Sequence, residues 1–219
     1  FNYEVIVVPQ GTVSQDALVG VLSAVEGVEN VYSGIAGAQI GLEGYASIEP
    51  FNEGSNQVFG IGTDPSQNEL DFSYDDGTGW SEDPTREGVV ITRSLADAID
   101  KGAGDTVVLT IGGQVYEYEV IGVDSFTFQD LIYFDWRDLG MKANRVDEAG
   151  TPLPSSFTVD LTGERGIVET NAIIEVLRED LRASGIEADF GNQPETEDEI
   201  AQQLNVFSMI FNLTSAVMA

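Results

Sequence analysis

The sequence contains no cysteine and no histidine, and its only lysines are Lys101 and Lys142. Without cysteine the chain forms neither a disulfide nor a thiolate metal site, so nothing indicates its redox compartment. Without histidine it lacks the commonest general base and the commonest ligand of transition metals. These absences leave an enzyme only two routes, a pair of carboxylates or a serine activated by a lysine.

Basic residues of both kinds are scarce. The 219 residues include 9 basic and 38 acidic side chains, which gives a formal net charge of −29. Nucleic acids and anionic membrane surfaces both require a basic face, so we exclude them as partners. Such a charge opposes folding in dilute salt, whereas at 1 M ionic strength it is screened within about 3 Å. Because the acids are spread along the chain, we favour a protein from a halophilic organism over an acidic surface that collects divalent cations.

No group of residues stands out as catalytic or metal-binding. Carboxylates are too abundant for a glycosidase-like pair to be recognised, and Lys101 has no serine in a recognisable motif. Residues 69–87 are the most acidic stretch, and they resemble a calcium loop at Asp71, Ser73, Asp75 and Glu82. The sixth position, Asp76, should be glycine in an EF-hand. We therefore expect a solvated loop here, and a chain with no enzymatic activity, cofactor, catalytic residue or metal ligand.

Two strand–helix–strand patterns enclose the middle of the chain. Residues 3–8 and 28–42 read as strands around a helix with apolar Ala17, Leu18, Val21, Leu22 and Val25. Residues 156–161 and 186–190 read as strands around a helix lined by Val168, Ile173, Leu177 and Leu181. Two such halves can form one sheet backed by two helices, which is a ferredoxin-like split β-α-β arrangement. The predicted fold class is α+β.

Residues 88–123 form the most regular unit. A strand at 88–91 precedes a short helix that Thr92 or Ser94 caps and that Gly102 and Gly104 end. The strands at 107–111 and 114–123 flank Gly112-Gly113, which is a typical two-residue hairpin turn.

The C-terminal segment changes character. Thr196–Glu199 matches a capping box, and no charged residue occurs from Ile200 to Ala219. A helix of this length spans about 30 Å, enough to cross a bilayer core. One side of this helix would carry a polar stripe, which indicates a helix that enters a bundle of helices. The alternative is an amphipathic helix that packs on the domain. The stripe consists of Gln202, Asn205, Ser208, Asn212 and Ser215.

Several short motifs occur in the order of a known family. They are Gly27-Val28, Val58-Phe59-Gly60-Ile61-Gly62-Thr63-Asp64-Pro65, Val89-Val90-Ile91, Ser94-Leu95-Ala96, Gly104-Asp105, Val107-Val108-Leu109 and Tyr118-Glu119-Val120-Ile121-Gly122-Val123. In this respect the chain resembles the MacB-like periplasmic core domain of ABC transporter permeases, the group that includes FtsX and the lipoprotein-releasing permeases. The resemblance covers most of the chain and is weakest at residues 69–87.

The resemblance implies a layout. Residues 1–63 plus 156–195 would form a porter-like subdomain, residues 64–155 an inserted β-rich subdomain, and residues 196–219 a helix leading toward a membrane span. It also implies an extracytoplasmic domain of a cell-membrane protein that couples ATP-driven motion to a substrate or partner outside. The implied partners are a second permease copy, a cytoplasmic ATPase subunit and an unknown extracellular substrate or protein.

Two questions stay open at this level. The first is the oligomeric state: repulsion between the negative charges of two copies favours a monomer for the isolated chain. The second is the function, for which the alternative is a salt-adapted cell-surface binding or structural module. The segments considered for partner contact are residues 69–87 and the aromatic stretch at residues 126–136, whose rings are either core or an exposed patch.

Overall fold

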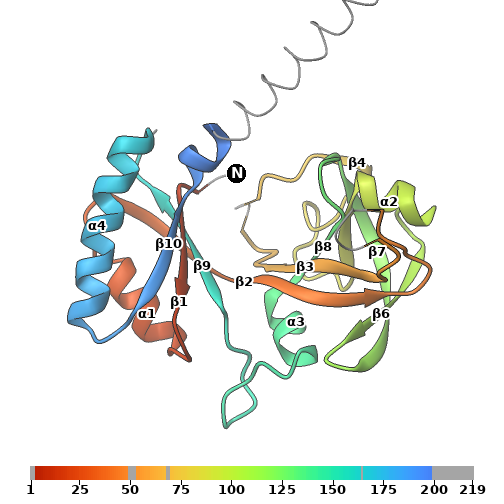
Figure 1. The fold of residues 1–219 in the computed structure, drawn as a ribbon, viewed down its shortest axis with the longest axis horizontal. Coiled ribbons are helices and arrows are strands. Elements are labelled where there is room, and N and C mark those ends of the chain that lie inside the picture. The colour runs from red at the N-terminus through yellow and green to blue at the C-terminus, as the bar shows by residue number, and fades with distance from the viewer. Residues whose placement is uncertain (1–2, 49–52, 68–69, 164, 199–219) are drawn as a thin grey trace, which may run out of the picture.

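The computed structural model describes residues 3–48, 53–67, 70–163 and 165–198 and shows two lobes (Figure 1). The α+β class predicted from the sequence is confirmed. In chain order the elements are β1 (Val5–Pro9), α1 (Gln15–Leu22), β2 (Val28–Leu42), β3 (Gln57–Thr63), β4 (Tyr74–Gly77), β5 (Val89–Thr92), α2 (Arg93–Ile99), β6 (Thr106–Ile111), β7 (Gln114–Asp124), β8 (Leu131–Asp135), α3 (Trp136–Lys142), β9 (Ser156–Leu161), α4 (Ile167–Ala183) and β10 (Ala188–Asn192).

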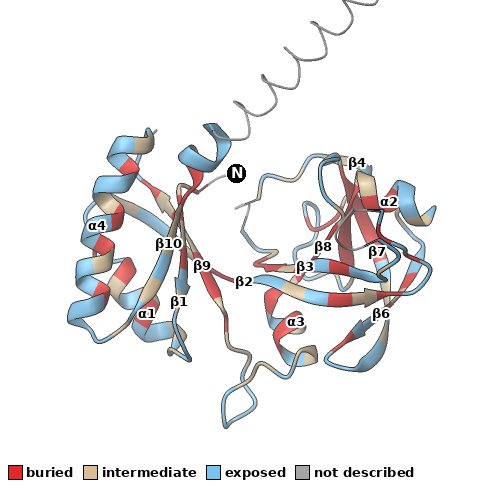
Figure 2. Ribbon diagram, viewed as in Figure 1, coloured by how far each residue is buried: buried red, intermediate tan, exposed pale blue. Residues whose placement is uncertain are grey.

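The first lobe is an antiparallel sheet with strand order β10-β1-β9-β2. Helices α1 and α4 cover one face, and their buried sides turn toward the strands (Figure 2). Alternate residues of β1, Val5 and Val7, are fully buried against Leu18, Leu22 and Leu177 of the two helices. The alternate residues of the strand and the residues on one side of each helix therefore face each other in a single apolar layer.

The buried face of α4 differs from the predicted one. Leu177 and Leu181 are buried as expected, but Val168 is 77% exposed. The helix instead buries Thr170 and Ile174. The buried residues 170, 174, 177 and 181 follow the helical period more closely than the predicted residues 168, 173, 177 and 181. The pattern was not recognised in the sequence because Thr170 is polar.

The second lobe is a closed barrel. Going round it, each strand pairs with the next in the order β2, β3, β8, β5, β7, β6 and back to β2. The pairs β3–β8 and β5–β7 are parallel and the others antiparallel. Closure leaves no free edge in the ring and encloses one large apolar core. Phe134 and Leu109 are fully buried in that core.

Strand β2 belongs to both lobes. Its first half pairs with β9 and its second half with β3, with a bulge between Ile35 and Ala38. The predicted layout placed residues 57–63 with the first lobe. These residues form β3, which pairs with β8, and Val58 lies in the barrel core.

The turn predicted at Gly112-Gly113 is confirmed. Both glycines have positive φ, 57° and 81°, and they join β6 to β7 as a hairpin. The end of the short helix α2 was predicted less well. Asp100, not Gly102, takes the left-handed C-cap conformation, with φ 53°, and α2 has no side-chain hydrogen bond at its N-cap, Thr92.

Thr196 is not the N-cap of the predicted capping box, whose other member, Glu199, lies outside the described residues. The chain is already helical at residues 193–198, because Asn192 is the cap: its side-chain oxygen accepts a hydrogen bond from the Glu195 backbone N–H at 3.2 Å. The Thr196 hydroxyl donates instead to the Asn192 carbonyl. The uncharged run at 200–219 lies outside the described residues. Among the described helices, none combines the length and the apolar character that a membrane span requires.

Candidate functional site

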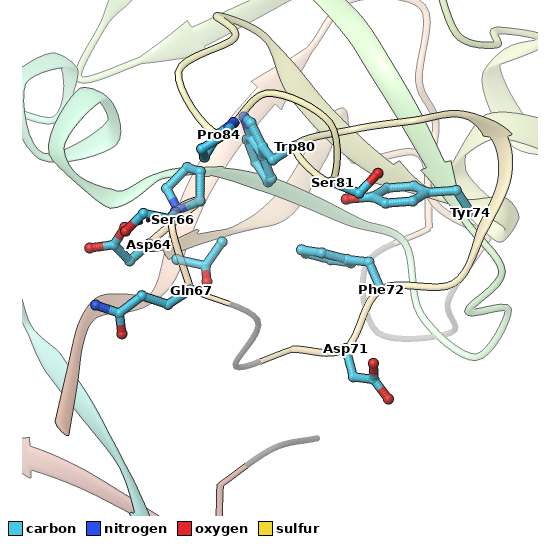
Figure 3. Close-up of a pocket in the computed structure, with 11 residues that line it drawn as sticks. Asp64, Ser66, Gln67, Asp71, Phe72, Tyr74, Trp80, Ser81 and Pro84 are labelled. Atoms are coloured by element: carbon cyan, nitrogen blue, oxygen red, sulfur yellow. Dashed lines mark hydrogen bonds between the residues drawn. The ribbon is translucent and has the colours of Figure 1, made fainter. Parts of the chain in front are cut away.

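A cavity of about 470 Å³ lies where β3 ends, beside the chain that leads into and out of β4 (Figure 3). Thr63, Asp64 and Pro65 continue β3 into one wall. The opposite wall consists of Phe72, Tyr74 and Trp80. Figure 3 shows the polar side chains of Ser66 and Gln67 across from the rings of Phe72 and Tyr74, with Trp80 beside Pro84.

The aromatic wall is a small core of its own. Phe72 packs with its ring centroid 4.9 Å from that of Tyr133 and 5.7 Å from that of Tyr74. Trp80 is 4% exposed and donates its indole N–H to the Arg86 carbonyl at 3.1 Å. These rings cover the outer side of the barrel at Val90, Ile121 and Tyr133. The stretch 69–87, predicted to be a solvated loop, therefore includes a strand and a packed aromatic cluster, although its acids stay largely exposed.

The fixed polar group of the cavity is Asp64, which is 6% exposed. Its carboxylate accepts a hydrogen bond from the Arg137 guanidinium at 2.8 Å and from the Ser66 hydroxyl at 2.6 Å. Burial alone raises the pKa of Asp64, but the bonds from Arg137 and Ser66 lower the pKa by more, so it lies below the usual range. Arg137 also stacks over Trp136, 4.7 Å from the ring centroid. Asp64 is therefore an ionised, positioned carboxylate.

A second cavity, of about 580 Å³, shares Trp80 and Pro84 with the first. Tyr116 and Tyr118 line it, and the Tyr118 hydroxyl donates to Asp138 at 2.5 Å. Burial, followed by this hydrogen bond to Asp138, raises the pKa of Tyr118 well above its usual value. The Lys142 ammonium lies 4.5 Å from the Tyr116 ring centroid and 3.5 Å from the Asp138 carboxylate.

The buried polar groups of the two cavities are held by neighbouring side chains. Asp64 is held by an arginine and a serine, and the Tyr118 phenol stays protonated. Across residues 3–48, 53–67, 70–163 and 165–198, no three carboxylates are grouped so as to hold a metal ion. Of the residues that suggested a calcium loop, Asp75 pairs with Arg93 at 3.0 Å.

The aromatic stretch at residues 126–136 is mostly core. Tyr133, Phe134 and Trp136 are buried, whereas Phe128 is 66% exposed beside Phe126. The exposed-patch alternative therefore holds for Phe128 and not for the rings of β8 and α3. The cavity lining was not predicted, although the alternation Phe72-Ser73-Tyr74 is a strand signal that could have indicated β4.

No protein-family model matches the sequence, and no curated protein matches it. Among solved structures, the periplasmic region of MacB from Actinobacillus actinomycetemcomitans matches with a TM-score of 0.56 and 17% identity, over 91% of this chain and 92% of that one. This chain has the fold of the MacB periplasmic region. A domain of a protein assigned as a permease in Porphyromonas gingivalis matches with a TM-score of 0.47 and 11% identity, over 88% of each chain. The MacB-like resemblance seen in the sequence is thereby confirmed at the level of the fold.

Proposed function

We propose that the chain is the extracytoplasmic domain of an ABC transporter permease in a cell membrane. In this function the domain has no catalytic role. It couples ATP-driven motion of membrane spans to a substrate or partner outside the cell. The fold shared with the MacB periplasmic region over nine tenths of both chains supports the proposal.

The observation that carries it is the position of the first and last strands. β1 and β10 are antiparallel neighbours, with Val5 opposite Asn192. Just beyond this pair, the Gln193 backbone N–H donates to the Glu4 carbonyl at 2.8 Å. The chain therefore enters the first lobe and leaves it at one place (Figure 1). A domain inserted between two membrane helices needs this geometry, because both connections must reach the same membrane surface.

The two lobes suit the transmission of motion. Each has its own apolar core, and the single strand β2 runs from one into the other through the bulge between Ile35 and Ala38. A push on the first lobe would move the barrel as a rigid body. We assign the first lobe as the porter-like, ferredoxin-like subdomain, formed by residues up to 34 together with 156–195. The inserted β-rich subdomain then includes the second half of β2 and β3 as well as residues 64–155.

The proposed partners follow from this assignment. They are a second permease copy, a cytoplasmic ATPase subunit, and an extracellular substrate or protein. We also propose that the net charge of −29 is an adaptation to high salt, in which it is screened.

The test is the reading frame beyond both ends of this sequence, together with its neighbours on the chromosome. We expect apolar segments of about 20 residues before residue 1 and continuing past residue 219, and a neighbouring ATPase frame. A frame without any apolar segment of that length on either side would overturn the proposal and leave a cell-surface module.

A further inference from the structure

One side of the barrel is built from strands without a charged residue, although the chain as a whole has a net charge of −29. The strands are β6, the second half of β2 (residues 35–42) and β3, which are neighbours in the ring (Figure 1). We propose that a second copy of this chain packs on this side. The inference deepens the proposed function, on which it rests for the role of the second copy, by naming the surface of contact.

Alternation along the strands defines the residues of this surface. Ile40, Val58 and Leu109 belong to the barrel core, so the residues before and after each of them point outward. The pairing of the strands places the outward residues in two adjoining rows that run from the start of β7 across β6 and β2 to β3. We call them the neutral face: Gln39, Gly41, Gln57, Phe59, Thr110 and Val115.

Two apolar side chains of the neutral face are open to solvent. Phe59 is 47% exposed and Val115 is 67% exposed. Leu131, the Cα partner of Phe59 on β8, is by contrast buried in the cluster of Trp80 and Tyr133. The aromatic segment that covers the outside of the barrel therefore leaves Phe59 uncovered. Aromatic side chains of this kind are enriched where proteins contact one another.

Charge indicates which partner fits this face. A basic partner would gain most from the acidic surfaces of the chain, such as the outer side of β7 with Glu117 and Glu119. A second copy has the same net charge of −29, so a contact between the acidic surfaces of two copies is repulsive. Through the neutral face two copies meet without placing carboxylates against each other, and the same face serves both copies of a twofold pair. Glu117, opposite Val108, lies at its margin.

The size of the face sets the strength of the pairing. Neighbouring strands are about 4.8 Å apart and strands of this length span about 20 Å, so the face covers roughly 300–400 Å² per copy. Interfaces of this size are typical of transient contacts, and we expect the isolated chain to pair with a Kd of roughly 0.1–1 mM. Attachment to one transporter supplies an effective concentration in the millimolar range, which is sufficient to keep the two copies together.

The test is paramagnetic broadening between copies of the full 219-residue chain. One population has a nitroxide at Glu43→Cys, on the exposed residue that follows β2, and the other is ¹⁵N-enriched and unlabelled. At about 2 M KCl, where charges are screened within less than about 3 Å, we expect the amides of Gln39, Phe59 and Thr110 to broaden as the protein concentration rises. Broadening should be weaker at about 0.1 M KCl. Its absence at about 2 M KCl and about 1 mM protein, or broadening confined to other elements, would overturn the proposal.

Two variants locate the contact. Val115→Glu adds a carboxylate to the neutral face and should weaken pairing about two- to five-fold. The matched control is Val168→Glu, which adds the same charge at an exposed valine of the first lobe and should leave pairing unchanged. Phe59→Ala removes the ring and should weaken pairing about five-fold or more. Should Phe59→Ala fail to fold, Val115→Glu decides with its control, and equal pairing of the two glutamate variants contradicts the assignment.

The neutral face and the permease role can fail separately. Pairing through this face in a chain whose reading frame has no membrane spans would support the contact surface and overturn the permease role. Flanking spans together with an absence of pairing at about 2 M KCl would support the permease role and overturn the contact surface.

Discussion

Tyr74 is held against the barrel by two glycines, and this gives a sharp test of the aromatic wall. A Cβ added at Gly122 would lie 2.8 Å from the Cδ1 and Cε1 atoms of Tyr74 and 2.9 Å from the backbone nitrogen of Gly79. An ordinary carbon–carbon contact is about 3.5–4.0 Å. The substitution Gly122→Ala must therefore displace the Tyr74 ring, or the backbone around Gly79, by several tenths of an ångström.

The expected cost follows from this clash. Overpacking of a well-packed site typically costs about 1–3 kcal/mol, and the backbone contact at Gly79 leaves little room to relax, so we expect Gly122→Ala to cost about 2–3 kcal/mol. The assay is urea unfolding of the full chain. The matched control is Gly20→Ala in α1, where an added Cβ meets nothing within 4 Å and the helix should gain about 0.5–1 kcal/mol.

A double-mutant cycle isolates the contact with the ring. In a Tyr74→Ala background the cost of Gly122→Ala should fall by at least about 1 kcal/mol, because the two positions are coupled only if they touch. An unchanged cost in that background, or a Gly122→Ala variant as stable as the parent chain, would refute the described packing of β4 on β7.

Three further predictions concern charge and burial. Because the pKa of Asp64 is lowered in the folded state, its ionised form stabilises the fold above its unfolded pKa of about 3.9, and this stabilisation is lost as the pH falls through the lower folded pKa. Arg137→Gln should lower the free energy of unfolding by about 1–2 kcal/mol near pH 7. The difference between the variant and the parent chain should shrink below about pH 4, and a difference in urea unfolding that does not depend on pH would contradict this. The buried Thr170 hydroxyl has no hydrogen-bond partner among the described residues, so Thr170→Val should raise stability by about 1 kcal/mol, and a loss of stability would show a missed partner. Raising KCl from about 0.1 to 2 M screens the net charge and should raise Tm by at least about 4 °C; a flat Tm in calorimetry would count against salt adaptation.

Local patterns predicted the elements of the fold well. The Gly112-Gly113 turn was predictable because both positions adopt positive φ, a conformation that glycine takes at little cost. The first lobe was predictable because β1 and α1 have clean apolar periods. The face of α4 was predicted imperfectly because Thr170 is buried, and a polar residue conceals a helical stripe.

The barrel and the cavity could not be predicted from local patterns. Closure depends on the pairing of Gly41 with Thr110, residues far apart in the chain, and no local signal specifies that partner. The cavity combines the end of β3 with rings of a segment whose acidic composition suggested only a solvated loop. Its aromatic wall depends on Tyr133 of β8, which the Phe72 ring contacts across the outer face of the barrel.

We propose that ATP-driven motion reaches this domain in a paired transporter, and this can be measured directly. These 219 residues contain no cysteine, so a Glu148→Cys substitution in the exposed turn of the second lobe gives one labelling site per copy once any cysteines in the rest of the transporter are replaced by serine. The measurement is the distance between two spin labels in the complete permease, reconstituted with its ATPase, with and without ATP turnover. We expect one inter-copy distance distribution that shifts when ATP is hydrolysed. The absence of any measurable pair, or a distribution that does not change during turnover, would contradict it.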